Sequence, residues 1–282
     1  MEIAFVHPQY PSAEGTGATY DATQIVSGLA DAGHEVCVYC TQDPAESADE
    51  RLDLRHLDGH SRHPHTPTRQ NRELLARQAE LREYDVLHSY LMSHVPAVAE
   101  IGADADLATV VTLNAYGGTC PKNDLRYLNR EQCRSRSTAK CLHCIARTSH
   151  TGDDNGYLYE ATGRLFMLGL LNRADRLRDR IDGFQAISPH VRDTYAAFGY
   201  DPAKMRVIPN ILDSQFDRDH ETTFEPPYRL LYAGSLSHKK GVDRLPEILS
   251  QVSARISEDV SLTIVGTGEL ETTLREAVRE RG

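Results

Sequence analysis

The sequence has 282 residues, enough for one large or two modest domains with their own apolar cores. Charged residues make up 26% of it and apolar residues 40%. No apolar run approaches the roughly 20 residues of a membrane span, and no signal-peptide pattern opens the chain. We therefore expect a cytoplasmic protein without a transmembrane segment. The formal net charge of −10 disfavours nucleic acid as a partner.

Short apolar runs rich in β-branched residues alternate with stretches of helical period. The predicted strands are Ile3–Val6, Val36–Tyr39, Val86–His88, Thr109–Leu113, Phe184–Ile187, Arg229–Ala233 and Leu262–Val265. Because most of these runs are continuously apolar, they are typical of a parallel sheet that helices cover on both faces. The polar stretch 41–70 is expected to be a surface excursion. We expect an N-terminal domain over 1–209, with an insertion at 116–154, and a second domain over 210–282.

A glycine-containing loop follows the first strand and opens directly into an amphipathic helix. Gly15 and Gly17 lie in this loop. Glycines let a phosphate approach the backbone, and a helix N-terminus offers free N–H groups and a positive dipole end. A diphosphate site and a plain loop are equally open interpretations. A dinucleotide fingerprint is less favoured, since Tyr20 stands where its third glycine or alanine belongs.

Two strand-to-helix turns in the second half repeat this arrangement. The first runs from Gly234 through Ser235 to Lys240 and Gly241, and the second contains Gly266 and Gly268. Ligands of open α/β sheets bind at the carboxyl ends of the strands, where a lysine can neutralise a phosphate. Lys240 is the main candidate for that contact. The alternative is a solvated loop.

Four cysteines in the insertion have the spacing C-x12-C-x7-C-x2-C. They are Cys120, Cys133, Cys141 and Cys144. Four thiolates can hold one structural zinc ion, and two cysteines separated by two residues are a common part of such sites. Four unliganded thiols are the alternative. The insertion also carries a net charge of +5 from Ala115 to His150, which suits a phosphate-bearing acceptor or a merely solvated basic loop.

Taken in order, these motifs resemble the retaining family-4 glycosyltransferases over nearly the whole chain. The shared features are Gly15–Gly17, Gly33-His34-Glu35-Val36, Ile187-Ser188, Val207-Ile208-Pro209-Asn210 with Asp213 and Phe216, Gly234–Gly241 and Gly266–Gly268. The resemblance implies a GT-B-like α/β fold of two Rossmann-like domains. It also implies a nucleotide-sugar donor, transfer with retention of configuration, a sugar or lipid-linked acceptor, peripheral membrane contact and no catalytic metal.

The same resemblance suggests roles for particular residues. Donor-binding residues would be Gly15, Gly17, Gly234, Ser235, Lys240, Gly266 and Gly268. Ser235 stands where the family has an arginine, and Asn114 stands where it has a histidine at the reaction centre. The chain ends at Gly282, before the family's paired glutamates would occur, so we expect an incomplete second domain with an open sheet edge, self-association and little turnover.

Two functions of other classes compete with transfer. A chain lacking those glutamates could bind a nucleotide or a sugar without turning it over. An oxidoreductase on the same general layout is the other alternative, and the absent third glycine argues against it.

Overall fold

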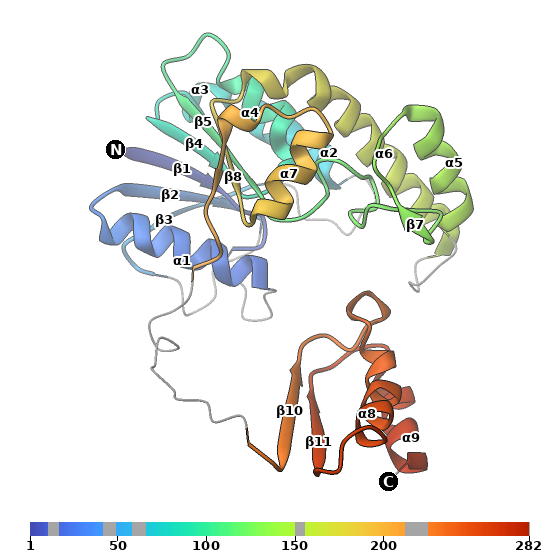
Figure 1. The fold of residues 1–282 in the computed structure, drawn as a ribbon. Helices are drawn as coiled ribbons and strands as arrows, with labels where there is room; N and C mark the ends of the chain where they lie inside the picture. The colour runs from blue at the N-terminus through green and yellow to red at the C-terminus, as the bar shows by residue number, and fades with distance from the viewer. Residues whose placement is uncertain (11–16, 42–48, 58–65, 150–155, 212–224, 282) are drawn as a thin grey trace. The chain divides into compact units, whose positions relative to one another are not determined.

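The computed structural model describes residues 1–10, 17–41, 49–57, 66–149, 156–211 and 225–281 (Figure 1). Its contacts divide the chain into two compact units, Met1–Phe216 and Asp217–Gly282. Each unit has its own parallel strands and its own apolar core. No helix in the described part of the chain is long and apolar enough to cross a membrane.

Unit 1 is built on a seven-stranded parallel sheet of order β3-β2-β1-β4-β5-β8-β9. Its strands are β1 (Glu2–Val6), β2 (Glu35–Cys40), β3 (Asp53–His56), β4 (Val86–Ser89), β5 (Ala108–Leu113), β8 (Gly183–Ala186) and β9 (Met205–Val207). A separate antiparallel hairpin joins β6 (Arg126–Tyr127) to β7 (Glu131–Gln132). The first strand is central, with β2 on one side and β4 on the other. The order therefore reverses beside β1, where doubly wound sheets open a crevice.

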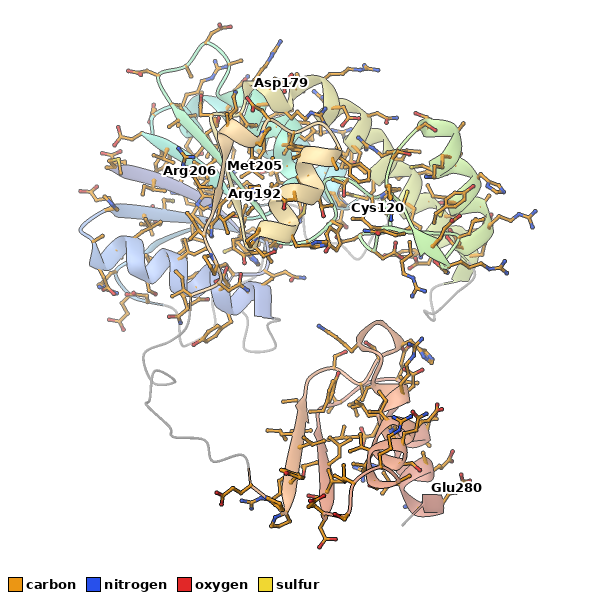
Figure 2. The ribbon with its side chains drawn as sticks, in the orientation of Figure 1. Cys120, Asp179, Arg192, Met205, Arg206 and Glu280 are labelled. Atoms are coloured by element: carbon orange, nitrogen blue, oxygen red, sulfur yellow. The ribbon has the colours of Figure 1, made fainter. Side chains whose placement is uncertain are left out.

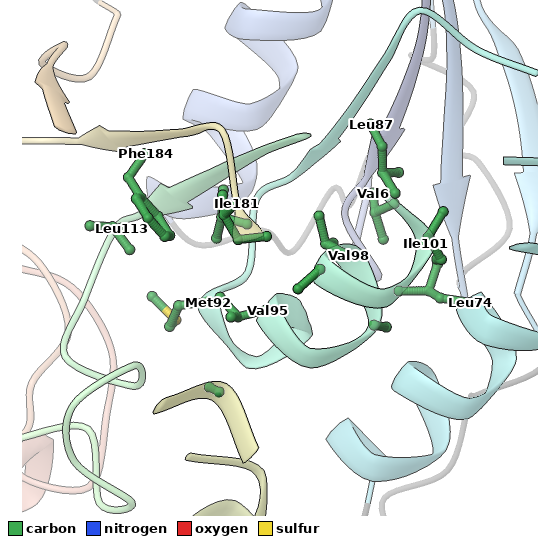
Figure 3. Packing of buried hydrophobic residues seen from close by; sticks show 14 of the residues in the cluster. Val6, Leu74, Leu87, Met92, Val95, Val98, Ile101, Leu113, Ile181 and Phe184 are labelled. Atoms are coloured by element: carbon green, nitrogen blue, oxygen red, sulfur yellow. The ribbon is translucent and has the colours of Figure 1, made fainter. Parts of the chain in front are cut away.

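Helices cover both faces of this sheet. The helices of unit 1 are α1 (Gly17–Asp31), α2 (Thr66–Ala76), α3 (Gln78–Leu81), α4 (Val95–Ile101), α5 (Thr138–Thr148), α6 (Gly156–Leu177) and α7 (Pro189–Ala197), with the short 3-10 helices η1 (Met92–His94), η2 (Arg178–Arg180) and η3 (Pro202–Lys204). Helix α5 packs on α6. Ala22, Ile25 and Val26 of α1 pack on one face, where the apolar stripe of the sequence predicts them. The other core lies under α2, α4, α6 and α7, with Val98 at its centre (Figure 3).

Strand β2 contributes to both cores because successive side chains of a strand point to opposite faces. Cys37 belongs to the core under α4, and Cys40 belongs to the core under α1. Both thiols are buried. They are packing residues that face away from each other, as i and i+3 positions of a strand require.

Unit 2 consists of two parallel strands and the helices that follow them. Its elements are β10 (Tyr228–Ala233), η5 (His238–Lys240), η6 (Val242–Arg244), α8 (Leu245–Ser253), β11 (Val260–Val265) and α9 (Glu271–Arg281). A small core joins Leu236 and Val242 to Leu270 and Leu274. Leu231 on β10 remains 69% exposed. Self-association through the open edge of this sheet stays a prediction.

All seven predicted strands are present, and each lies within or overlaps an observed one. Two edge strands were not predicted. Strand β3, with the sequence Asp-Leu-Arg-His, has no apolar run because it is mostly exposed, and β9 has only three residues. The interpretation of 41–70 as a surface excursion was therefore wrong in part, since it contains β3 and the start of α2.

Candidate functional site

The carboxyl ends of β1, β4 and β5 bring a group of polar residues to one edge of unit 1. His7 follows β1, Tyr90 follows β4 and Asn114 follows β5. The ring centroids of His7 and Tyr90 are 5.2 Å apart, and Asn114 lies near enough to Tyr90 to oppose the rise that burial and Asp21 give to the pKa of Tyr90. Asn114 is half-buried. The structure thus places the predicted reaction-centre residue at the edge where ligands of open α/β sheets bind.

The first glycine loop leads to the same edge. Gly17 is the first residue of α1, and a Cβ atom added to it would meet nothing within 4 Å. Backbone N–H groups in the first turn of a helix lack intrahelical partners and can bind an anion. Gly15 lies outside the described residues, so its predicted contact with a diphosphate stays a prediction.

Asp21 is a site residue that was not predicted from the sequence. Its side chain is buried on α1, with only 1% of the residue exposed. Oδ2 accepts a hydrogen bond from the Tyr90 hydroxyl at 2.6 Å, and Oδ1 accepts one from the Ile211 amide at 2.8 Å. The available signal was a carboxylate directly beside Ala22 in the apolar stripe of an amphipathic helix, a position where an acid needs partners.

Three histidines lie buried close to this edge. Burial lowers the pKa of His7 to about 4, that of His88 to about 4 and that of His94 to about 3. His88 Nε2 lies 2.8 Å from the Thr112 hydroxyl, and His94 Nδ1 lies 2.9 Å from the Ser89 hydroxyl. All three rings are therefore neutral near pH 7 and contribute hydrogen bonds but no charge.

The two glycine turns of unit 2 lock together at the carboxyl ends of β10 and β11. The Gly234 amide donates to the Val265 carbonyl at 3.0 Å, and the Leu236 amide donates to the Thr267 carbonyl at 2.9 Å. Gly266 has a φ of 147°, and a Cβ atom on it would stand 1.9 Å from the Gly234 carbonyl oxygen. Only glycine allows the two backbones to pass this closely.

Ser235, Lys240 and Gly268 belong to the same pair of turns. Lys240 ends η5 with its side chain exposed, and its amide donates to the Ser237 carbonyl at 3.0 Å. The Ser235 hydroxyl lies 3.1 Å from that of Ser237. Among the described residues, no carboxylate forms an ion pair with Lys240, so its ammonium group is available to an anion.

The insertion after β5 is fastened to unit 1 by buried contacts. The Tyr195 hydroxyl, on α7, donates to the Ala115 carbonyl at 2.8 Å and accepts from the Gly118 amide at 3.1 Å. A Cβ atom on Gly118 would lie 2.7 Å from the Tyr195 ring. Arg136 forms an ion pair with Asp175 on α6. Helices α7 and α6 therefore hold the described part of the insertion at Ala115, Gly118 and Arg136.

The four predicted zinc ligands all lie in this insertion, and Cys120 is marked in Figure 2. The pKa of Cys141 is raised to about 11, mainly by burial. The neighbouring thiols of Cys120, Cys133 and Cys144 raise it further. The Leu128 amide donates to Cys144 Sγ at 3.3 Å. In the part of the chain that is described, no three His, Cys, Asp or Glu side chains form a metal-binding group. The zinc site stays a prediction.

Solved structures share this architecture at low sequence identity. Sucrose-phosphate synthase from Thermosynechococcus elongatus aligns with a TM-score of 0.60 at 14% identity, over 99% of this chain and 67% of that one. Anabaena HepE in complex with UDP gives 0.58 at 14%, over 100% and 64%. The apo form of WaaB, a lipopolysaccharide outer core galactosyltransferase, gives 0.57 at 15%, over 99% and 65%. The fold is that of GT-B glycosyltransferases.

The chain spans about two thirds of the length of those three structures. No curated protein matches its sequence. The profile of Glycosyltransferase Family 4 matches residues 15–216, which is more than half of the chain. The protein therefore belongs to Glycosyltransferase Family 4.

Proposed function

We propose that this protein transfers a sugar from a nucleoside-diphosphate donor to an acceptor, with retention of configuration. The interlocked turns of unit 2 carry the proposal, because they put glycine backbone and the exposed Lys240 at the carboxyl ends of two parallel strands. A departing diphosphate is stabilised by fixed positive charge and backbone donors at such a position. The UDP complex of HepE supports a nucleoside diphosphate as the ligand class.

Calorimetric titration with UDP tests the donor site. A charged contact to the diphosphate contributes about 1.5–3 kcal/mol, so Lys240→Ala should weaken UDP binding about tenfold or more. Arg229→Ala is the matched control, since Arg229 is exposed at the opposite end of β10. An equal loss in both variants, or no UDP binding by the unchanged protein, would contradict the donor site.

The stereochemical part of the proposal needs its own measurement. Proton NMR of a reaction with UDP-glucose identifies the anomer first released to water or to an acceptor, and an α product from the α-linked donor demonstrates retention. Asn114 has an amide but no group that takes up a proton near pH 7. We expect Asn114→Ala to slow this release while UDP affinity is kept. A protein that binds UDP without releasing glucose would instead support the binding-only alternative.

We also propose that Cys120, Cys133, Cys141 and Cys144 hold one structural zinc ion. The proposal is supported by the presence of all four thiols in one small insertion, with the thiols of Cys120, Cys133 and Cys144 near enough to Cys141 to raise its pKa after burial. Elemental analysis should find about one zinc per chain. The double variant of Cys141→Ser and Cys144→Ser should lose it, while Cys37→Ser keeps it. A folded, zinc-free insertion would refute the site.

A further inference from the structure

A groove in the insertion has no part in the donor site. Its volume is about 490 Å³, and it is lined by Tyr127, Glu131, Gln132, Arg134 and Lys140. One wall comes from the β6–β7 hairpin, and Lys140 comes from the first turn of α5. The insertion that carries the groove follows Asn114 directly along the chain, and Tyr195 holds its first residues.

Contacts among its own residues hold two walls of the groove in place. Lys140 Nζ lies 5.0 Å from the centroid of the Tyr127 ring and donates to the Ser135 carbonyl at 3.2 Å. The Tyr127 hydroxyl lies 2.8 Å from His143 Nδ1. A lysine fixed in this way loses less conformational freedom when it binds an anion than a free surface lysine does.

The groove is lined by two basic residues, Arg134 and Lys140, and one acidic residue, Glu131. Arg134 is exposed and makes no ion pair or side-chain hydrogen bond with any described residue. Glu131 is the acidic residue of the lining, whereas Asp124, the other acid between Ala115 and His150, is paired with Lys122 at 3.3 Å. A net charge of +5 between Ala115 and His150, in a protein of charge −10, favours an anionic ligand at this surface.

We propose that this groove binds a phosphorylated sugar as the acceptor, an inference that rests on the proposed glycosyltransferase function. The guanidinium of Arg134 and the ammonium of Lys140 bind the phosphate. Glu131 and Gln132 face the sugar hydroxyls, for which a carboxylate offers acceptors and an amide offers both kinds of group. Because Glu131 repels a second anionic group but accepts from hydroxyls, we expect free phosphate to bind more weakly than a phosphate that carries hydroxyl groups.

Calorimetric titration of the whole chain with glucose 1-phosphate, inorganic phosphate and glucose tests the groove. The unchanged protein should bind glucose 1-phosphate more tightly than either of the other two. Arg134→Gln should weaken that binding about tenfold, the loss of one charged contact. Arg147→Gln is the control, since Arg147 is equally exposed and unpaired among the described residues of the insertion but does not line the groove.

The outcomes separate this proposal from the donor site. UDP affinity should be the same in both arginine variants, so a failure of the donor site shows only in the UDP titration of the unchanged protein. Equal losses in Arg134→Gln and Arg147→Gln would reduce the groove to general charge attraction and overturn the proposal. The proposal would also be overturned if inorganic phosphate bound as tightly as glucose 1-phosphate. It would be overturned as well if glucose 1-phosphate did not bind at millimolar concentration.

Discussion

The hydroxyl of Tyr90 and the carboxylate of Asp21 are joined by a 2.6 Å hydrogen bond between the end of β4 and helix α1. The second oxygen of the same carboxylate accepts from the Ile211 amide, 190 residues further along the chain. One buried side chain thus ties the helix after the glycine loop to the segment that leaves β9. We expect the position of α1 to depend on this carboxylate.

A double-mutant cycle measures that dependence. Tyr90→Phe leaves a buried carboxylate oxygen without its donor, which should lower the free energy of unfolding by about 1–3 kcal/mol. Asp21→Asn should destabilise comparably. Because the two residues share one bond, their effects in urea unfolding should fall short of additivity by about 0.5–3 kcal/mol. Strictly additive losses would show that the bond contributes nothing.

Gly266→Ala should disrupt unit 2. The new methyl group would meet the Gly234 carbonyl at 1.9 Å, and the φ of 147° is unfavourable for alanine. We expect a loss of about 3 kcal/mol or more, seen as a lower melting temperature and faster proteolysis of residues 225–281. Gly28→Ala is the contrasting control, because Gly28 lies exposed in α1 and a methyl group added there would have no neighbour within 4 Å. It should stabilise by about 0.5–1 kcal/mol.

Stability should fall in mild acid because of the buried histidines. In the unfolded chain a histidine takes up a proton near pH 6.5, whereas in the folded chain the pKa of His94 is about 3 and that of His88 about 4. The unfolded state therefore binds more protons than the folded state as the pH drops below 6.5. Each histidine then lowers the free energy of unfolding by about 1.4 kcal/mol per pH unit.

Urea titrations between pH 8 and 5 check this expectation. The free energy of unfolding should be nearly constant above pH 7 and fall below pH 6.5. The free energy of unfolding of His94→Gln should be lower at every pH. Below pH 6.5 it should fall less steeply than that of the unchanged protein, by about 1.4 kcal/mol per pH unit. An identical slope in the variant would show that His94 takes no part.

Arg136→Ala should loosen the insertion. The guanidinium is largely buried and paired with Asp175, which also pairs with Arg178 at 3.2 Å. Removing it should cost about 1–3 kcal/mol and speed amide hydrogen exchange in α5. Arg147→Ala, in the last turn of the same helix, should change neither quantity. Unaltered exchange in Arg136→Ala would mean that the Tyr195 contacts suffice to hold the insertion.

The sequence predicted best what depends on local apolar pattern. Val36–Tyr39 is buried and continuously apolar, and Thr109–Leu113 is mostly buried and rich in β-branched residues, so both strands were predicted. The exposed edge strand Asp53–His56 was not predicted. It pairs with β2 through backbone hydrogen bonds, which require no apolar pattern in its side chains.

In the candidate site, too, the locally encoded parts were predicted and the long-range contacts were not. The turns at Gly234 and Gly266 were predicted, since a glycine directly after an apolar strand is typical of a tight turn where two backbones come close. Asp21 was not predicted, because its partners Tyr90 and Ile211 come from distant parts of the chain. Contacts of that kind become visible only when the topology brings the strands together.

The anchoring of the insertion by Tyr195 also bears on how the protein is made. During synthesis the insertion leaves the ribosome before its anchor, since Gly118 precedes Tyr195 by 77 residues. At about 5–20 residues per second, roughly 4–15 s pass between the two. All four cysteines are made within that interval, before α7 can hold the segment that carries them. The insertion is therefore without this anchor until nearly all of unit 1 has been made.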